Sequence, residues 1–387
     1  MGAEPMRHWP LAIILTVQAF ILYDCSLKNS PTPDEFPHIV GGLHHLANGG
    51  NQFYNVNPPL VKLLAVLPSI SEGVALPANS EFDYTKFKRP EFRLGDRFFE
   101  QQPAVAKLIL YRARLMMIAI ANLGTAGVYV LTLLLLKDNQ PSRRSSILLP
   151  SLAAVVYSFS PMILGYAAFV QTDVTAATAI VWVVTVGLIW SRSTTPVTTV
   201  IFGIVFGFAL CTKYTLWIGF GILPFFLLLR DSLSPSISRS IFHYLCVCVI
   251  AIAMVNLIVG GTRPWQQLGE YQFSSRKLAG SGFGNDQTFP RFGNSFDDTV
   301  ASQILVPFPP TVLEGVDIQI RDMQDERKRP GAPLPRFRHA VGWTLVGLRC
   351  EATVQAGAVA TGVALATLFG AVLANRLGMR LGPDVRA

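Results

Sequence analysis

Two adjacent acidic residues follow the first apolar run of the chain, in the segment SPTPDEFPHIVGG (30–42), where they are Asp34 and Glu35. A carboxylate where a chain leaves a membrane is costly unless it is hydrated or paired, so such groups are candidates for function. Asp173, in FVQTDVTAA, lies at a second boundary between apolar runs. Helix capping is the alternative for Asp34 and for Asp173, although one cap needs only one acid of the adjacent pair. A carboxylate in this position can take a proton from a hydroxyl or an amine.

Cationic residues are predicted at the same membrane face. Lys62 follows Pro58 and Pro59, whose restricted backbone sets the direction in which Asn57 and Lys62 point. Lys62 could reach the lipid headgroups with its long side chain or bind a phosphate. Lys213, in CTKYT between two short apolar runs, favours a phosphate contact. Two more cations open the second long apolar run on this side, Arg112 and Arg114.

These residue types fit a reaction at a lipid-linked phosphate. Cations at headgroup depth would bind the phosphate, and a carboxylate would remove the proton of an acceptor. If the phosphate carries a sugar, displacement at the anomeric carbon needs little else, because polyprenyl phosphate is a good leaving group and a second catalytic carboxyl group is not required.

Membrane spans must position these residues. Of the 387 residues, 51% are hydrophobic and 14% are charged, whereas about a quarter of the residues of a soluble domain are charged. Apolar runs near the roughly 20 residues that cross a bilayer predict an all-α, multi-pass helical bundle. The predicted spans are 9–27, 112–136, 147–169, 174–190, 197–211, 214–229, 241–259 and, as the weakest, 352–374. The short runs 197–211 and 214–229 could instead form one broken pair.

The distribution of Lys and Arg predicts the orientation. With the N-terminus inside, the outer short loops hold only Lys213, and the inner short loops hold Lys137, Arg143, Arg144, Arg192, Arg230 and Arg239. This predicts a membrane core over 1–260 with an outer loop at 28–111, an outer region at 261–351, and a last span with an inner tail at 352–387. The net charge of +8 then reflects orientation and anionic headgroups, and we expect membrane lipids rather than nucleic acid as partners.

Four segments, in this order, resemble the glycosyltransferase-C superfamily: TPDEFPHIVGGLHHLANG, NPPLVKLLAVLP, VQTDVTAA and GIVFGFALCTKYTLW. The branch they resemble contains the protein O-mannosyltransferases and the bacterial aminoarabinose transferase, and the resemblance covers roughly residues 9 to 260. It implies a transferase of the cell envelope, in the bacterial inner membrane, that moves a sugar from a polyprenyl-phosphate donor to an acceptor on the outer face. It identifies neither the sugar nor the acceptor.

The resemblance also implies roles for single residues. Asp34 matches the proposed catalytic base of the family, Glu35 matches its neighbour that positions the acceptor, and Asp173 matches a second acidic position. Lys62 and Lys213 fall where family members place polar groups near the donor phosphate.

Further residues are candidates for orienting the substrates. Asn57 is one, and His38 is a second that could join Glu35 in a divalent metal site, since some family members bind a metal and others do not; no cofactor is otherwise expected. Asp317 and Gln319, in VPFPPTVLEGVDIQIRDMQDE, would face the acceptor or lie in a solvated turn.

The sequence departs from the family pattern after Glu326. One alternative is therefore a truncated, inactive relative. Another is a transporter or lipid flippase that moves its substrate intact, although the inverted repeats and midplane ionisable residues typical of transporters are not evident in the sequence.

Overall fold

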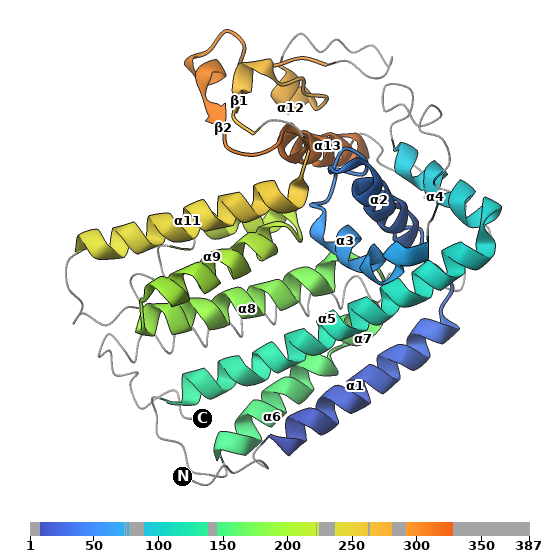
Figure 1. Ribbon diagram of the computed structural model, residues 1–387, viewed down its shortest axis with the longest axis vertical. Coiled ribbons are helices and arrows are strands. Elements are labelled where there is room, and N and C mark those ends of the chain that lie inside the picture. Colours follow the sequence, from blue (N-terminus) through green and yellow to red (C-terminus); the bar gives the residue numbers. More distant parts are fainter. Residues whose placement is uncertain are drawn as a thin grey trace.

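The computed structural model of the chain describes residues 8–72, 74, 76, 89–137, 145–221, 223, 237–261, 264–280 and 292–327. Apolar helices form its main body, and Figure 1 shows them side by side, from α6 and α1 through α5 and α8 to α9 and α11. Their bounds are α1 Trp9–Lys28, α5 Pro103–Lys137, α6 Ser145–Ser158, α8 Thr172–Arg192, α9 Pro196–Leu210 and α11 Ile237–Val259.

Four of these helices, α1, α5, α8 and α11, are long and apolar enough to cross a membrane, and α6 and α9 are shorter apolar helices. The described part of the chain is therefore mostly helical and has the composition of an all-α membrane protein. The predicted spans 9–27, 112–136, 174–190 and 241–259 each lie within one of the four long helices.

The predicted span 147–169 is wrong as a single helix, because α6 ends at Ser158 and α7 (Pro161–Tyr166) begins separately. Ser160 is extended, and its hydroxyl accepts a hydrogen bond from the backbone N–H of Ile163, which caps the new helix. Pro161 has no N–H to continue the preceding helix and favours the first helical position.

The two short apolar runs, 197–211 and 214–229, have different conformations. Residues 197–211 lie mostly in α9, which starts with a capping box between Thr195 and Thr198. The run 214–229 starts as a 3-10 helix, η3 (Tyr214–Ile218), and most of the remainder lies outside the described residues. The predicted span 352–374 also lies outside them.

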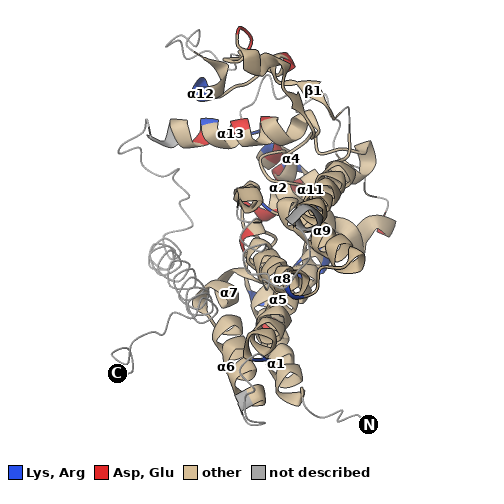
Figure 2. Ribbon diagram, turned by 90° about the vertical axis from the view of Figure 1, so that its left-hand side faces the viewer, with Lys and Arg blue, Asp and Glu red and all other residues tan. Residues whose placement is uncertain are grey.

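The remaining elements gather at one end of the bundle, which we call the α13 end (Figure 1). Figure 2 shows charged residues on α4, α12 and α13 at this end, while the bundle helices are mostly uncharged along their length. The elements are α2 Glu35–Asn48, α3 Leu60–Val66, η1 Leu67–Glu72, α4 Pro90–Gln101, β1 Gln266–Gln267, η4 Leu268–Glu270, α12 Arg276–Ala279, η5 Val300–Gln303, β2 Leu305–Val306 and α13 Pro310–Arg327. The strands β1 and β2 form an antiparallel pair, in which Gln266 lies opposite Val306.

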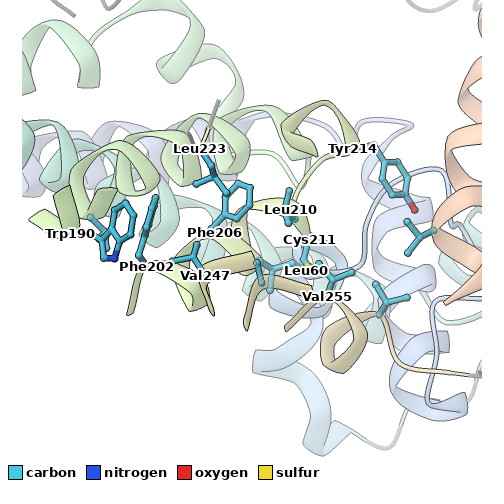
Figure 3. Close-up of a cluster of buried hydrophobic side chains, with 14 of the residues drawn as sticks. Leu60, Trp190, Phe202, Phe206, Leu210, Cys211, Tyr214, Leu223, Val247 and Val255 are labelled. Carbon is cyan, nitrogen blue, oxygen red and sulfur yellow. The ribbon is translucent and has the colours of Figure 1, made fainter. Parts of the chain in front are cut away.

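The largest hydrophobic cluster connects the bundle to the α13 end. Figure 3 shows it running from Trp190 and Phe202, through Phe206 and Leu210, to Tyr214 beside α13. Close packing of α9 on α11 supports this cluster, because α9 carries glycines where a Cβ would lie 2.5–2.7 Å from α11 side chains. The bundle therefore packs directly against the segments that carry the candidate site.

Candidate functional site

Asp34 stands at the start of α2, at the N-cap position, where its side chain makes no capping hydrogen bond. The residue is exposed, yet the surrounding protein removes part of the hydration of the carboxyl group. This desolvation raises the pKa of Asp34 above 3.8; the Arg89 charge lowers the pKa, and the charges of Asp173 and Glu35 raise it. Asp34 is therefore an accessible carboxylate with increased proton affinity, within electrostatic reach of its neighbour Glu35 and of charged groups from two other segments.

The Asp173 carboxylate pairs with Lys213 at 2.5 Å. Asp173 lies in the first turn of α8, whose N-cap is Gln171, and Lys213 follows α9 and precedes η3. The two side chains are 46% and 29% exposed, respectively, so a ligand can reach both. The acid and the lysine to which the resemblance assigns roles are therefore paired with each other at an accessible position.

Glu35, next to Asp34, is fully buried. Its carboxylate accepts two hydrogen bonds from Arg114, at 2.9 and 2.7 Å, and others from the backbone N–H groups of Val170 (3.1 Å) and Thr32 (2.8 Å). Glu35 therefore joins the loop that carries Asp34 to the turn before Asp173. The predicted role in positioning an acceptor would require this network to open.

Arg114 is buried at the other side of this network. Besides Glu35, its guanidinium donates to the carbonyl oxygens of Ser26 (2.7 Å), Asn29 (2.9 Å) and Ser30 (3.1 Å). A cation at the C-terminal carbonyls of α1 is stabilising, because these carbonyls are otherwise unpaired and carry the negative end of the helix dipole. Arg114 therefore fixes the exit of α1, whereas the sequence predicted a contact with the donor phosphate.

Arg112, two residues before Arg114 on α5, has different surroundings. Its guanidinium pairs with Glu72 and donates to the carbonyl oxygen of Pro68, and both members of the ion pair are about one-third exposed. Arg112 remains close to the surface, where the predicted contact with a phosphate would compete with Glu72.

Lys62 is fully buried and does not lie at the surface. Its ammonium donates to the side-chain oxygen of Asn51 at 2.5 Å and to the carbonyl oxygen of Tyr54 at 2.6 Å. Burial lowers the pKa of Lys62 to about 7, although the Glu91 charge opposes this shift. In this conformation the Lys62 side chain can contact neither a donor phosphate nor the lipid headgroups, which were the two predicted roles.

The four residues predicted to orient substrates lie on several segments. Asn57 donates to the Tyr54 hydroxyl (3.2 Å), and Gln319 of α13 donates to the Val56 carbonyl oxygen (2.8 Å). Asp317 is buried and accepts hydrogen bonds from the backbone N–H groups of Ser274 and Ser275 and from the Ser274 hydroxyl. Asp317 therefore ties α13 to the preceding segment rather than lying in a solvated turn.

His38 is buried with its ring against the ring of Tyr54 (5.0 Å between centroids). Burial, helped by the Lys62 charge, lowers the pKa of His38 to about 3, so it is neutral at physiological pH. Glu35, its predicted partner for a divalent metal, is already bonded to Arg114. No cluster of three or more metal-binding side chains occurs in the described part of the chain.

Arg89 is the residue of this site that the sequence did not single out. It precedes α4, pairs with Glu91, and reaches across to Asp322 of α13 at 2.8 Å. Its charge also acts on Asp34. The motif KRPEF predicts only a helix start at the proline, and nothing in it indicates a partner more than 200 positions away.

A scan of protein-family models, a search of curated proteins and a search of solved structures each gave no match for this chain. The class of the protein therefore follows from its own structure: an α-helical membrane protein with a group of acidic and basic side chains at one end of the bundle.

Proposed function

We propose that the protein is a membrane glycosyltransferase that moves a sugar from a polyprenyl-phosphate donor to an acceptor. The observation that carries this proposal is the accessible Asp34 carboxylate, with its raised pKa, within electrostatic reach of Arg89 and of Asp173, which itself pairs with Lys213. An accessible base, with an accessible acid–lysine pair within electrostatic reach through its acid, suits a substrate with a phosphate at headgroup depth.

In the proposed reaction, Asp34 takes the proton of the acceptor hydroxyl or amine as that group attacks the anomeric carbon. The bond between this carbon and the phosphate oxygen breaks, and the oxygen leaves with the electron pair. Lys213 stabilises the negative charge of the departing phosphate, and Asp173 holds Lys213 in position. One displacement inverts the anomeric carbon. A raised pKa favours Asp34 in this role, since a base acts best when its pKa approaches the working pH.

Glu35 and Arg114 are positioning residues in this proposal. Their network connects three segments: the exit of α1, the Asp34 loop, and the turn before α8. It therefore fixes the separation of Asp34 and Asp173 without contact to either substrate. A rigid support of this kind is what a preorganised site needs.

The test uses purified full-length protein in lipid vesicles, given a panel of polyprenyl-phosphate sugars that carry separate isotope labels on the sugar and on the lipid. Mass spectrometry of the products distinguishes the candidate functions. Separation of the two labels, with free polyprenyl phosphate released, supports a transferase. Passage of the doubly labelled donor across the membrane intact contradicts it and indicates a transporter. An intact donor that stays in place with every sugar, in folded protein, indicates the inactive relative.

A further inference from the structure

Three consecutive carbonyl oxygens in the loop 49–57 accept hydrogen bonds from side chains of three different elements. Lys62 of α3 donates to Tyr54 (2.6 Å), Tyr214 of η3 donates to Asn55 (2.9 Å), and Gln319 of α13 donates to Val56 (2.8 Å). Tyr54 has a positive φ of 58°, which is unfavourable for a residue with a bulky side chain. The surrounding contacts therefore hold this loop in a conformation that it would not adopt alone.

The other end of the 49–57 loop is attached to the bundle. The backbone N–H of Asn51 donates to the carbonyl oxygen of Val259 at the end of α11 (3.0 Å), and Gly50 forms a bridge with Gly260. The loop thus connects four elements: α3, η3, α11 and α13. Lys213 directly precedes Tyr214, so the position of the proposed donor-binding cation depends on the same loop.

Lys62 is the buried cation beneath this loop. It donates to two points within the loop, since Asn51 and Tyr54 are its acceptors, and its side-chain nitrogen lies 5.1 Å from the centroid of the Tyr54 ring. Helix α2 packs closely over it, because Gly42 leaves room for the Lys62 carbonyl where a Cβ would lie 2.4 Å away.

The titratable groups around Lys62 come from each neighbouring element. His38, His44 and His45 of α2 are buried, have a ring nitrogen without a partner among the described residues, and have pKa values lowered by burial and then by the Lys62 charge. Glu91 of α4 is the acidic group that acts on Lys62, and Arg89 binds that carboxylate. On α5, Arg112 and Arg114 are bound to Glu72 and Glu35.

Neutral histidines and a carboxylate already paired with Arg89 compensate a buried ammonium poorly. Burial therefore gives Lys62 a pKa of about 7, against 10.5 in water. If the loop opens and water reaches Lys62, the amine regains its ordinary proton affinity. Between these two pH values the open form binds one more proton than the closed form, so a rise in pH favours closure.

We propose that Lys62 is a positioning residue that holds the 49–57 loop in its closed conformation, and that opening of this loop is coupled to uptake of a proton by Lys62. Opening releases the carbonyls bound by Tyr214 and Gln319, and so loosens η3 with Lys213 and α13 together. The consequence for sugar transfer rests on the proposed function, whereas the proton-linked opening does not.

The experiment is hydrogen–deuterium exchange of the full chain in lipid vesicles, without any donor, from pH 7 to pH 9. Exchange of amides in the 49–57 loop is corrected for the intrinsic effect of pH and compared with amides in the middle of α8. In the wild type, protection of the loop should increase with pH by up to about tenfold per unit, which is the effect of one linked proton. The α8 amides should show no such slope.

Two variants test whether the pH dependence of loop protection comes from the proton on Lys62. Lys62→Met removes the titrating group, and Lys62→Arg keeps a charge at every pH in this range, so the slope should vanish in both. Lys28→Met is the matched control, because Lys28 is 72% exposed, and it should keep the wild-type slope.

A wild-type loop whose protection is flat or falls with pH overturns the proposal, as does an unchanged slope in Lys62→Met. If the Lys62 variants do not fold, the comparison between the loop and α8 in the wild type still decides the matter. Since no donor is present, failure of sugar transfer leaves this result intact, and the two proposals fail independently.

Discussion

Two arginines two residues apart on α5 provide a matched test of how the candidate site is held together. Arg114 forms a buried ion pair with Glu35, with side-chain exposures of 4% and 0%. Arg112 pairs with Glu72 at exposures of 32% and 29%. Replacement of each arginine by methionine keeps an unbranched apolar chain and removes the charge and the hydrogen-bond donors.

The structure predicts very different losses in the free energy of unfolding for the two replacements. Arg114→Met leaves the Glu35 carboxylate buried without its cation, which costs about 3–5 kcal/mol. It also removes the donors to the carbonyl oxygen of Ser26 in the last turn of α1 and to those of Asn29 and Ser30 just after the helix. Arg112→Met disrupts a partly hydrated pair and should cost about 0–1 kcal/mol. Against a total stability of roughly 5–15 kcal/mol, only the first loss threatens the fold.

The assay is reversible unfolding of purified protein in mixed micelles, with the free energy of unfolding measured for the wild type and both variants. The double variant Glu35→Gln/Arg114→Met should recover part of the loss of Arg114→Met, because no buried charge remains unpaired. Equal losses for Arg112→Met and Arg114→Met, or a double variant less stable than Arg114→Met alone, would refute the assignment of Glu35 and Arg114 as a buried structural pair.

Three further predictions follow from the same geometry. Because the pKa of Asp34 is raised, the folded protein holds this proton more tightly than the unfolded chain, so the contribution of the proton to stability is lost as the pH rises from 3.8 through the folded pKa. Asp34→Asn should therefore leave the free energy of unfolding at pH 7 unchanged or higher, and a strongly destabilised variant would contradict this. The rate of sugar transfer by the wild type should increase through that same pH range. Gly315→Ala should cost about 1–3 kcal/mol in the same unfolding assay, because its Cβ would lie 2.0 Å from a backbone oxygen, whereas Gly165→Ala, with nothing within 4 Å of its Cβ, should be neutral or stabilising. Lys213→Met should change stability by less than about 1 kcal/mol but increase the KM for the donor about tenfold or more, and an unchanged KM would remove Lys213 from the donor site.

The helices of the bundle were predictable because their signal is local. Length and apolar composition locate α1, α5, α8 and α11 without any knowledge of packing. The break between α6 and α7 was also present in the sequence, in the dipeptide Ser160–Pro161, but the surrounding apolar residues concealed it in a prediction based on hydropathy.

The partners of the site residues were not predictable, because they depend on contacts between distant segments. Glu35 and Arg114 are 79 positions apart in the chain, and both residue types also occur at membrane surfaces. Lys62 shows the same difficulty: its position after two prolines suggested a surface cation, whereas close packing against the glycines of α2 buries it. Residue types indicated which chemistry is available, and packing decided which side chains remain accessible.

The central claim, that Asp34 is the base of a sugar transfer, is tested most directly by one rate comparison in vesicles. The rate of release of free polyprenyl phosphate is measured for Asp34→Asn and for Asp24→Asn, in which the altered acid is exposed on α1 and pairs only with Lys28 within the described structure. A general base contributes about 10²- to 10⁴-fold, so Asp34→Asn should lose activity by that factor while Asp24→Asn keeps the wild-type rate. Equal rates for the two variants would contradict the account.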